Sequence, residues 1–159
     1  MINSDKEIRE IIKTLQDIYS GDPWYGPNIR TVIEDIPESE LFIRHGCSHS
    51  IFELLFHIIA WRLFVIRRLK GEPEEGKIDL ENWIDIAHLT NPDLKKIIEK
   101  LDEIQEELLL LLESINDSKL SMVVEEKNYT FRKMLTGLMH HDLYHLGQIS
   151  LLIRGKGNI

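Results

Sequence analysis

Apolar residues recur at intervals of three and four in four segments of this sequence, and no segment shows the alternation with a period of two that a strand needs. The pattern predicts an all-α fold, a four-helix bundle with long connections. We expect helices near residues 4–20, 50–70, 91–116 and 130–154. Connections as long as 21–49 and 71–90 are usually crossovers or coverings of a functional site. Residues 1–159 have the length of a single domain.

The second expected helix has the clearest sequence signals. Ser50 can cap its N-terminus, Glu53 can complete a capping box, and Gly71 marks its end. This helix is apolar nearly all round, so we expect it to be central or to line a subunit interface, and we expect a homodimer. We also expect a short β-like segment at 120–129 and a short helix near Trp83. The caps expected elsewhere are Asn3 or Ser4 for the first helix and Asn91, followed by Pro92, for the third.

The charge balance argues against a nucleic-acid partner. The chain has 19 basic and 27 acidic residues and a net charge of −8, so a phosphate-binding surface is not expected. The apolar runs are too short or too interrupted to span about 30 Å of hydrocarbon, so we expect no membrane association. Basic residues near the end of the second helix are assigned to its solvated face, where cations complement the helix dipole: Arg62, Arg67, Arg68 and Lys70.

Cysteine usage points to a reducing compartment. Cys47 is the only cysteine, so the chain cannot form an internal disulfide. The N-terminal residues carry no readable secretory signal, and we therefore expect a cytoplasmic protein. We interpret Cys47 as a residue without a functional role, and not as a nucleophile or a metal ligand.

Three of the seven histidines stand where the helical pattern calls for an apolar side chain. His141 and His145 are four residues apart, so their rings project from one face of a helix, close enough to bind one ion. His57 faces the same interior if the second and fourth helices pack together. Three imidazoles would leave a coordination position open, as catalytic metal sites do. The alternative is three separately satisfied core histidines. The other four are assigned to solvent or to loops: His140, His45, His49 and His88.

Other metal architectures fit the sequence less well. It has neither the Glu-x-x-His pairs of a di-iron bundle nor the His-Glu-x-x-His of a zincin. Glu53 lies one turn before His57 and could face the ion, but capping is its expected role. As further candidates, Gln148 and Tyr144 would orient substrate or water, and Asp142 would support a ligand histidine.

Several motifs together resemble the DinB-like, or YfiT-like, proteins. The most specific is 141–149, His-Asp-Leu-Tyr-His-Leu-Gly-Gln-Ile, with 49–57, 68–72, 21–27 and Trp83 in support. The resemblance implies a four-helix bundle, often dimeric, with a metal held by one histidine of the second helix and two of the last. Those positions match the same three histidines. Some relatives transfer low-molecular-weight thiols such as bacillithiol, mycothiol or glutathione.

The function expected from these observations is that of a metal-dependent enzyme. We predict a bacillithiol-like thiol S-transferase acting on small-molecule electrophiles, because metal coordination deprotonates a thiol without a separate base. Zinc is the ion expected first, with nickel or iron as alternatives. A hydrolase that uses metal-bound water, and a non-catalytic, stress-related metal-binding bundle, remain open. The sequence names neither the metal, nor the thiol, nor its acceptor.

Overall fold

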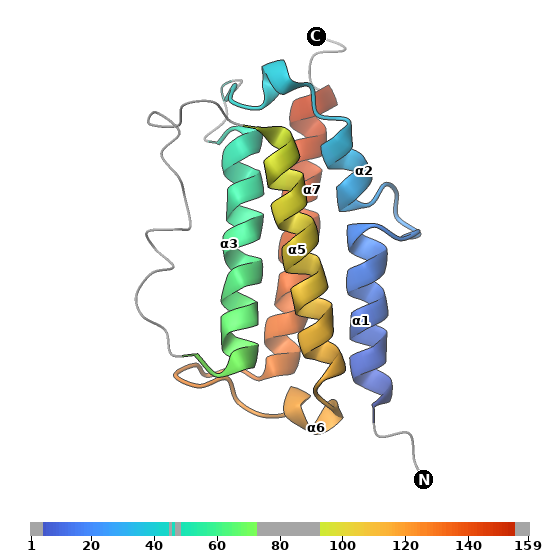
Figure 1. Cartoon of the computed structure of the whole chain (residues 1–159), viewed down its shortest axis with the longest axis vertical. Coiled ribbons are helices and arrows are strands. Elements are labelled where there is room, and N and C mark those ends of the chain that lie inside the picture. Colours follow the sequence, from blue (N-terminus) through green and yellow to red (C-terminus); the bar gives the residue numbers. More distant parts are fainter. Residues whose placement is uncertain (1–4, 45, 47–48, 73–92, 155–159) are drawn as a thin grey trace.

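A computed structural model describes residues 5–44, 46, 49–72 and 93–154. Four long helices run side by side along the length of the molecule (Figure 1). They are α1 (Lys6–Tyr19), α3 (Ile51–Lys70), α5 (Leu94–Glu113) and α7 (Phe131–Arg154). Three shorter elements join them: α2 (Ile29–Glu34), the 3-10 helix η1 (Glu38–Glu40) and α6 (Asp117–Leu120). The prediction of an all-α bundle is confirmed.

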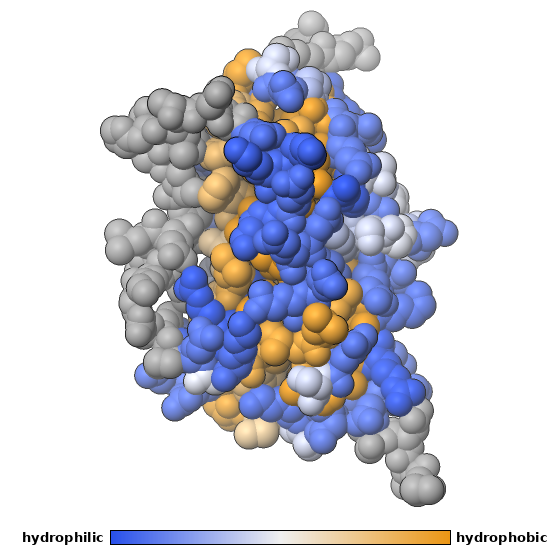
Figure 2. All heavy atoms as spheres, viewed as in Figure 1, coloured by the Kyte–Doolittle hydropathy of each residue, from blue (hydrophilic) through white to orange (hydrophobic). Residues whose placement is uncertain are grey.

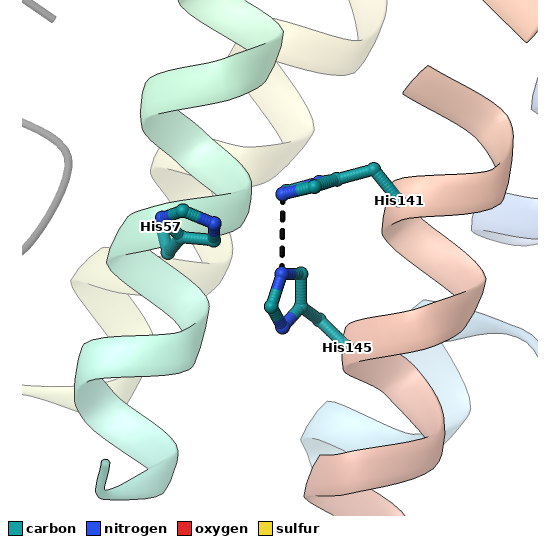
Figure 3. A group of neighbouring side chains, drawn as sticks. All are labelled: His57, His141 and His145. Carbon is teal, nitrogen blue, oxygen red and sulfur yellow. Dashed lines mark hydrogen bonds between the residues drawn. The ribbon is translucent and has the colours of Figure 1, made fainter. Parts of the chain in front are cut away.

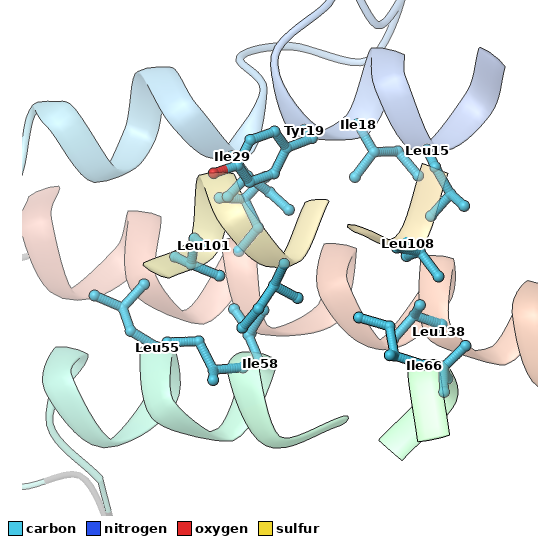
Figure 4. Close-up of a cluster of buried hydrophobic side chains, with 14 of the residues drawn as sticks. Leu15, Ile18, Tyr19, Ile29, Leu55, Ile58, Ile66, Leu101, Leu108 and Leu138 are labelled. Atoms are coloured by element: carbon cyan, nitrogen blue, oxygen red, sulfur yellow. The ribbon is translucent and has the colours of Figure 1, made fainter. Parts of the chain in front are cut away.

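Helices α3 and α1 each pack against both α5 and α7, so the core lies among all four long helices. Figure 4 shows apolar side chains from these helices and from α2 meeting in this interior. Leu15, Leu55, Leu101 and Leu108 are fully shielded from solvent. The apolar stripes that predicted the helices therefore form their contact surfaces.

Both predicted ends of α3 are confirmed. The Ser50 hydroxyl accepts a hydrogen bond from the Glu53 backbone N–H, while the Glu53 side chain accepts one from the Ser50 N–H, which completes the capping box. Gly71 ends the helix in the left-handed conformation with φ 76°, which a residue without Cβ adopts at little cost. Most side chains of α3 are buried within the single chain, so the fold already covers much of the apolar surface that suggested a dimer.

Two predicted caps were wrong. Helix α5 begins at Leu94, and its N-cap is Asp93, whose side chain accepts the backbone N–H of Lys95; the predicted cap, Asn91, lies outside the described residues. At α1, Asp5 is the N-cap residue but makes no side-chain cap hydrogen bond; the predicted caps, Asn3 and Ser4, lie outside the described residues. The free N–H groups of Glu7 and Ile8 instead donate to the carboxylate of Asp117, at 3.1 and 2.8 Å. A residue 110 positions away thus caps the first helix, which local sequence patterns do not reveal.

The connections contain more structure than predicted. Helix α2 lies inside the first connection, where the Asn28 side chain accepts from the Thr31 N–H, and Ile29 and Ile33 are buried. Val123, in the predicted β-like segment, forms an isolated antiparallel bridge with Thr130, which directly follows that segment. The short helix expected near Trp83 lies outside the described residues.

Polar and charged residues cover most of the outward face of α5 (Figure 2). Leu110 is an exception, with 59% of its surface exposed. In the part of the chain that the structure describes, no helix combines the length and apolar character needed to cross a lipid bilayer.

Candidate metal centre

Three imidazoles converge between α3 and α7. His57 projects from α3 toward His141 and His145, which lie one turn apart on the facing side of α7 (Figure 3). One ligand nitrogen from each ring lies within 4.8 Å of the others. The ring centroid of His57 is 4.8 Å from that of His141 and 4.7 Å from that of His145. The structure thus brings together the three histidines that the sequence selected.

The nitrogen spacing on α7 suits a shared ion. The Nε2 atoms of His141 and His145 are 3.1 Å apart. Zinc–imidazole bonds of about 2.0–2.1 Å with tetrahedral or right-angled geometry place neighbouring ligand nitrogens about 2.8–3.4 Å apart. The same distance also allows a hydrogen bond between the two rings. Both Nε2 atoms point into the space that the three rings surround, whether an ion or a hydrogen bond joins them.

Gln148 determines which nitrogen of His145 is available. Its Oε1 lies 2.6 Å from His145 Nδ1, and an amide oxygen can only accept, so Nδ1 carries the proton. The lone pair of His145 then resides on Nε2, which faces the other two histidines. The sequence pattern suggested Gln148 as a residue that orients substrate or water; in the structure its side chain contacts a histidine of the centre.

Burial keeps the α7 histidines neutral. It lowers the pKa of His141 to about 3, with further lowering by the nearby His145 and His57. Burial also lowers the pKa of His145, assisted by His57 and His49, while the hydrogen bond to Gln148 opposes this effect. The Nδ1 atom of His141 is buried and has no hydrogen-bond partner within the described ranges. Neutral rings with free lone pairs are the form that binds a metal ion.

A buried ion pair lies directly beside the histidines. Asp142 Oδ2 accepts from Arg62 Nε at 3.1 Å and from Nη2 at 2.8 Å, and neither side chain is exposed. Arg62 Nη1 also donates to Gln105 Oε1. The assignment of Arg62 to a solvated helix face was therefore wrong, and that of Arg68 was too, since it is 4% exposed. The expected support of a histidine by Asp142 is not seen, because its carboxylate faces Arg62 instead.

Glu53, Tyr144 and His140 have other surroundings. Glu53 takes part in the capping box and also accepts hydrogen bonds from Arg44. Burial acts to raise the pKa of Glu53, but the bonds from Arg44 and Ser50 lower it overall.

Tyr144 is 64% exposed and packs edge-on against the His145 ring. His140 is exposed and lines a separate cavity. His45, Cys47 and His88 lie outside the described residues.

A mainly apolar cavity adjoins the centre on the His141 side. Its volume is about 270 Å³, and it lies between α3 and α7. Trp61 forms a wall shared with the centre, because its ring packs against those of both His57 and His141. No sequence signal marked this cavity.

Comparison with known proteins identifies the family of the chain. No curated protein and no solved structure shows significant similarity to the chain. The sequence profile of the DinB superfamily matches residues 27–149, which include α3, α5 and all three histidines of the centre. The chain therefore belongs to the DinB superfamily.

Proposed function

We propose that this protein is a metal-dependent enzyme that holds one divalent ion on His57, His141 and His145. The convergence of one nitrogen from each ring within 4.8 Å carries the proposal. Two further features support it. The pKa of His141 and that of His145 are lowered, so both rings are neutral at physiological pH. Gln148 holds the His145 ring in the tautomer whose Nε2 is free.

The reaction proposed is transfer of a low-molecular-weight thiol to a small electrophile. An ion on three imidazoles retains an open position, at which it acidifies a thiol or a water molecule. The sulfur would form a bond to the electrophilic carbon, the leaving group would depart with its electron pair, and the thiol proton would pass to solvent. His57, His141 and His145 would place the sulfur beside Trp61, which borders the neighbouring cavity.

The position of Glu53 favours thiol transfer over hydrolysis. Attack by water is usually assisted by a general base. Glu53, the carboxylate that the sequence suggested could face the ion, is held by Arg44 and by the capping box instead. A thiol is acidic enough to be deprotonated by coordination alone. Zinc is the ion proposed first, with nickel or iron as alternatives, because imidazole ligands suit all of them.

Metal analysis combined with a thiol panel tests this function. Protein prepared without a metal-binding tag would be reconstituted with zinc, nickel or iron and assayed with bacillithiol, glutathione or cysteine and a chromogenic aryl halide. We expect thiol-dependent release of halide that requires the metal and is lost in His57→Ala. Hydrolysis of esters without thiol would support the hydrolase alternative. Stoichiometric metal without any turnover would favour the non-catalytic bundle.

We also propose that the protein forms a homodimer. Phe56, Trp61 and Leu63 on α3 remain partly exposed in the single chain, and Leu151 on α7 is 73% exposed. Apolar surface left uncovered in this way is typical of subunit interfaces. Sedimentation analysis at micromolar concentration should show a species of twice the chain mass. Observation of the monomer alone would contradict the proposal.

A further inference from the structure

The cavity beside the metal centre is built from aromatic and aliphatic side chains. It is lined by Trp61, Phe64 and Val65 of α3, by Met134 and Leu138 of α7, and by Tyr129, which precedes α7. His141 also borders it, so one ring contributes to both the cavity and the centre. Any molecule in this cavity would therefore lie against a ring of the proposed metal site.

Among the residues that the structure describes, Lys133 is the only charged side chain that lines the cavity. Lys133 and Gly137 are exposed, so the cavity reaches solvent on their side of α7. Where the chain is described, the Lys133 ammonium takes part in no ion pair. The remaining walls offer mainly apolar surface, which favours an apolar occupant.

The size of the cavity limits the occupant to a ring-sized group. A dry apolar cavity of about 150 Å³ accommodates benzene. At about 270 Å³, this cavity accommodates one ring with a short substituent. Aromatic side chains also pack favourably against another ring, edge-on or offset. We infer that the cavity binds the apolar, ring-sized part of the electrophilic substrate whose reacting carbon lies at the histidine centre. This inference rests on the proposed function and adds the substrate class.

Gly137 provides a way to fill the cavity without disturbing the core. A Cβ built on Gly137 meets no atom within 4 Å, although the residue lines the cavity. In Gly137→Leu the new side chain would occupy space that the substrate ring needs. Leucine also has the higher helix propensity, so α7 should not be weakened. Gly147→Leu is the matched control, because Gly147 lies on the same helix, has equally open surroundings and does not line this cavity.

Fluorobenzene binding to the metal-free protein tests the cavity independently of catalysis. Fluorine NMR should show saturable binding to wild type and to Gly147→Leu, and binding at least about tenfold weaker to Gly137→Leu. Absence of saturable binding to wild type, or equal binding to Gly137→Leu, would overturn the inference. Circular dichroism of both variants would verify that the helical fold is retained.

A comparison of two electrophiles tests whether the cavity serves the reaction. The ratio of kcat/KM for benzyl bromide to that for bromoethane should fall at least about tenfold in metal-loaded Gly137→Leu and stay unchanged in Gly147→Leu. An unchanged ratio in Gly137→Leu would overturn the assignment. Failure of the proposed function would be recognised separately, as absence of metal uptake and of turnover in wild type while fluorobenzene still binds.

Discussion

Arg62 of α3 and Asp142 of α7 form an ion pair that is fully shielded from solvent, and Asp142 directly follows His141 in the chain. The pair connects the same two helices that carry the three histidines. Gln105 extends this network, since it accepts from Arg62 and donates to the backbone carbonyl of Leu15. Buried hydrogen bonds thus join α1, α3, α5 and α7 next to the proposed metal centre.

Removing one member of this ion pair should destabilise the fold. Arg62→Met leaves the Asp142 carboxylate buried without its cation, which costs about 3–5 kcal/mol of unfolding free energy. The double variant Arg62→Met/Asp142→Leu should lose less than the sum of the single variants, because no buried charge is left. Urea denaturation measures each free energy. As a control, Lys13→Ala removes an exposed ion pair with Asp17 and should cost at most about 0.5 kcal/mol.

Each histidine of the centre should be needed for metal binding. Replacing His57, His141 or His145 by alanine leaves two imidazoles, so metal affinity should fall severely. Elemental analysis after dialysis against a weak chelator measures the loss. The matched control is His140→Ala, because His140 adjoins His141 in the sequence but is exposed and lies outside the three-histidine group. Metal loss in His140→Ala together with retention in His141→Ala would contradict the site.

Gln148 should contribute to metal affinity through the His145 ring. Gln148→Ala removes the acceptor for Nδ1–H, and loss of such a support typically weakens metal binding about 10–100-fold. Gln148→Glu keeps an acceptor oxygen and should restore most of the affinity. Competitive titration with a chromogenic chelator measures both constants. Equal affinities in wild type and Gln148→Ala would show that His145 is oriented by packing alone.

Acid should destabilise the metal-free protein. The pKa of His141 is lowered from 6.5 to about 3, so the unfolded chain binds more protons than the native state between these values. Stability is therefore greatest above pH 6.5 and falls as the pH decreases toward 3. The slope should stay below about 1.4 kcal/mol per pH unit, because the ring is only partly buried. Urea midpoints measured at about pH 7.5 and about pH 5 should differ less in His141→Gln.

The sequence predicted the parts of the fold that depend on local patterns. Apolar periodicity located α1, α3, α5 and α7, and the Ser50 and Glu53 signals placed the start of α3 correctly. The three histidines were recognisable because polar rings stood on apolar stripes. That reasoning needed only the assumption that α3 and α7 pack together, which the structure confirms.

The features that were not predicted depend on how side chains of helices far apart in the sequence are positioned relative to one another. A charged residue such as Arg62 is expected in solvent, and only the position of Asp142 on α7 makes its burial favourable. The contact of Gln148 with His145 depends on side-chain conformation, so spacing alone could suggest a role in the site but not its partner. The cavity beside His141 depends on side-chain packing between α3 and α7.

The cap that Asp117 provides for α1 has a consequence for synthesis on the ribosome. The N–H groups of Glu7 and Ile8 obtain their acceptor from a residue that is translated more than a hundred positions later. Until that residue has left the exit tunnel, these N–H groups at the N-terminus of α1 lack their acceptor, and α1 lacks its packing partners α5 and α7. The nascent N-terminal segment therefore becomes stable late in translation, after α5, α6 and α7 have emerged from the tunnel.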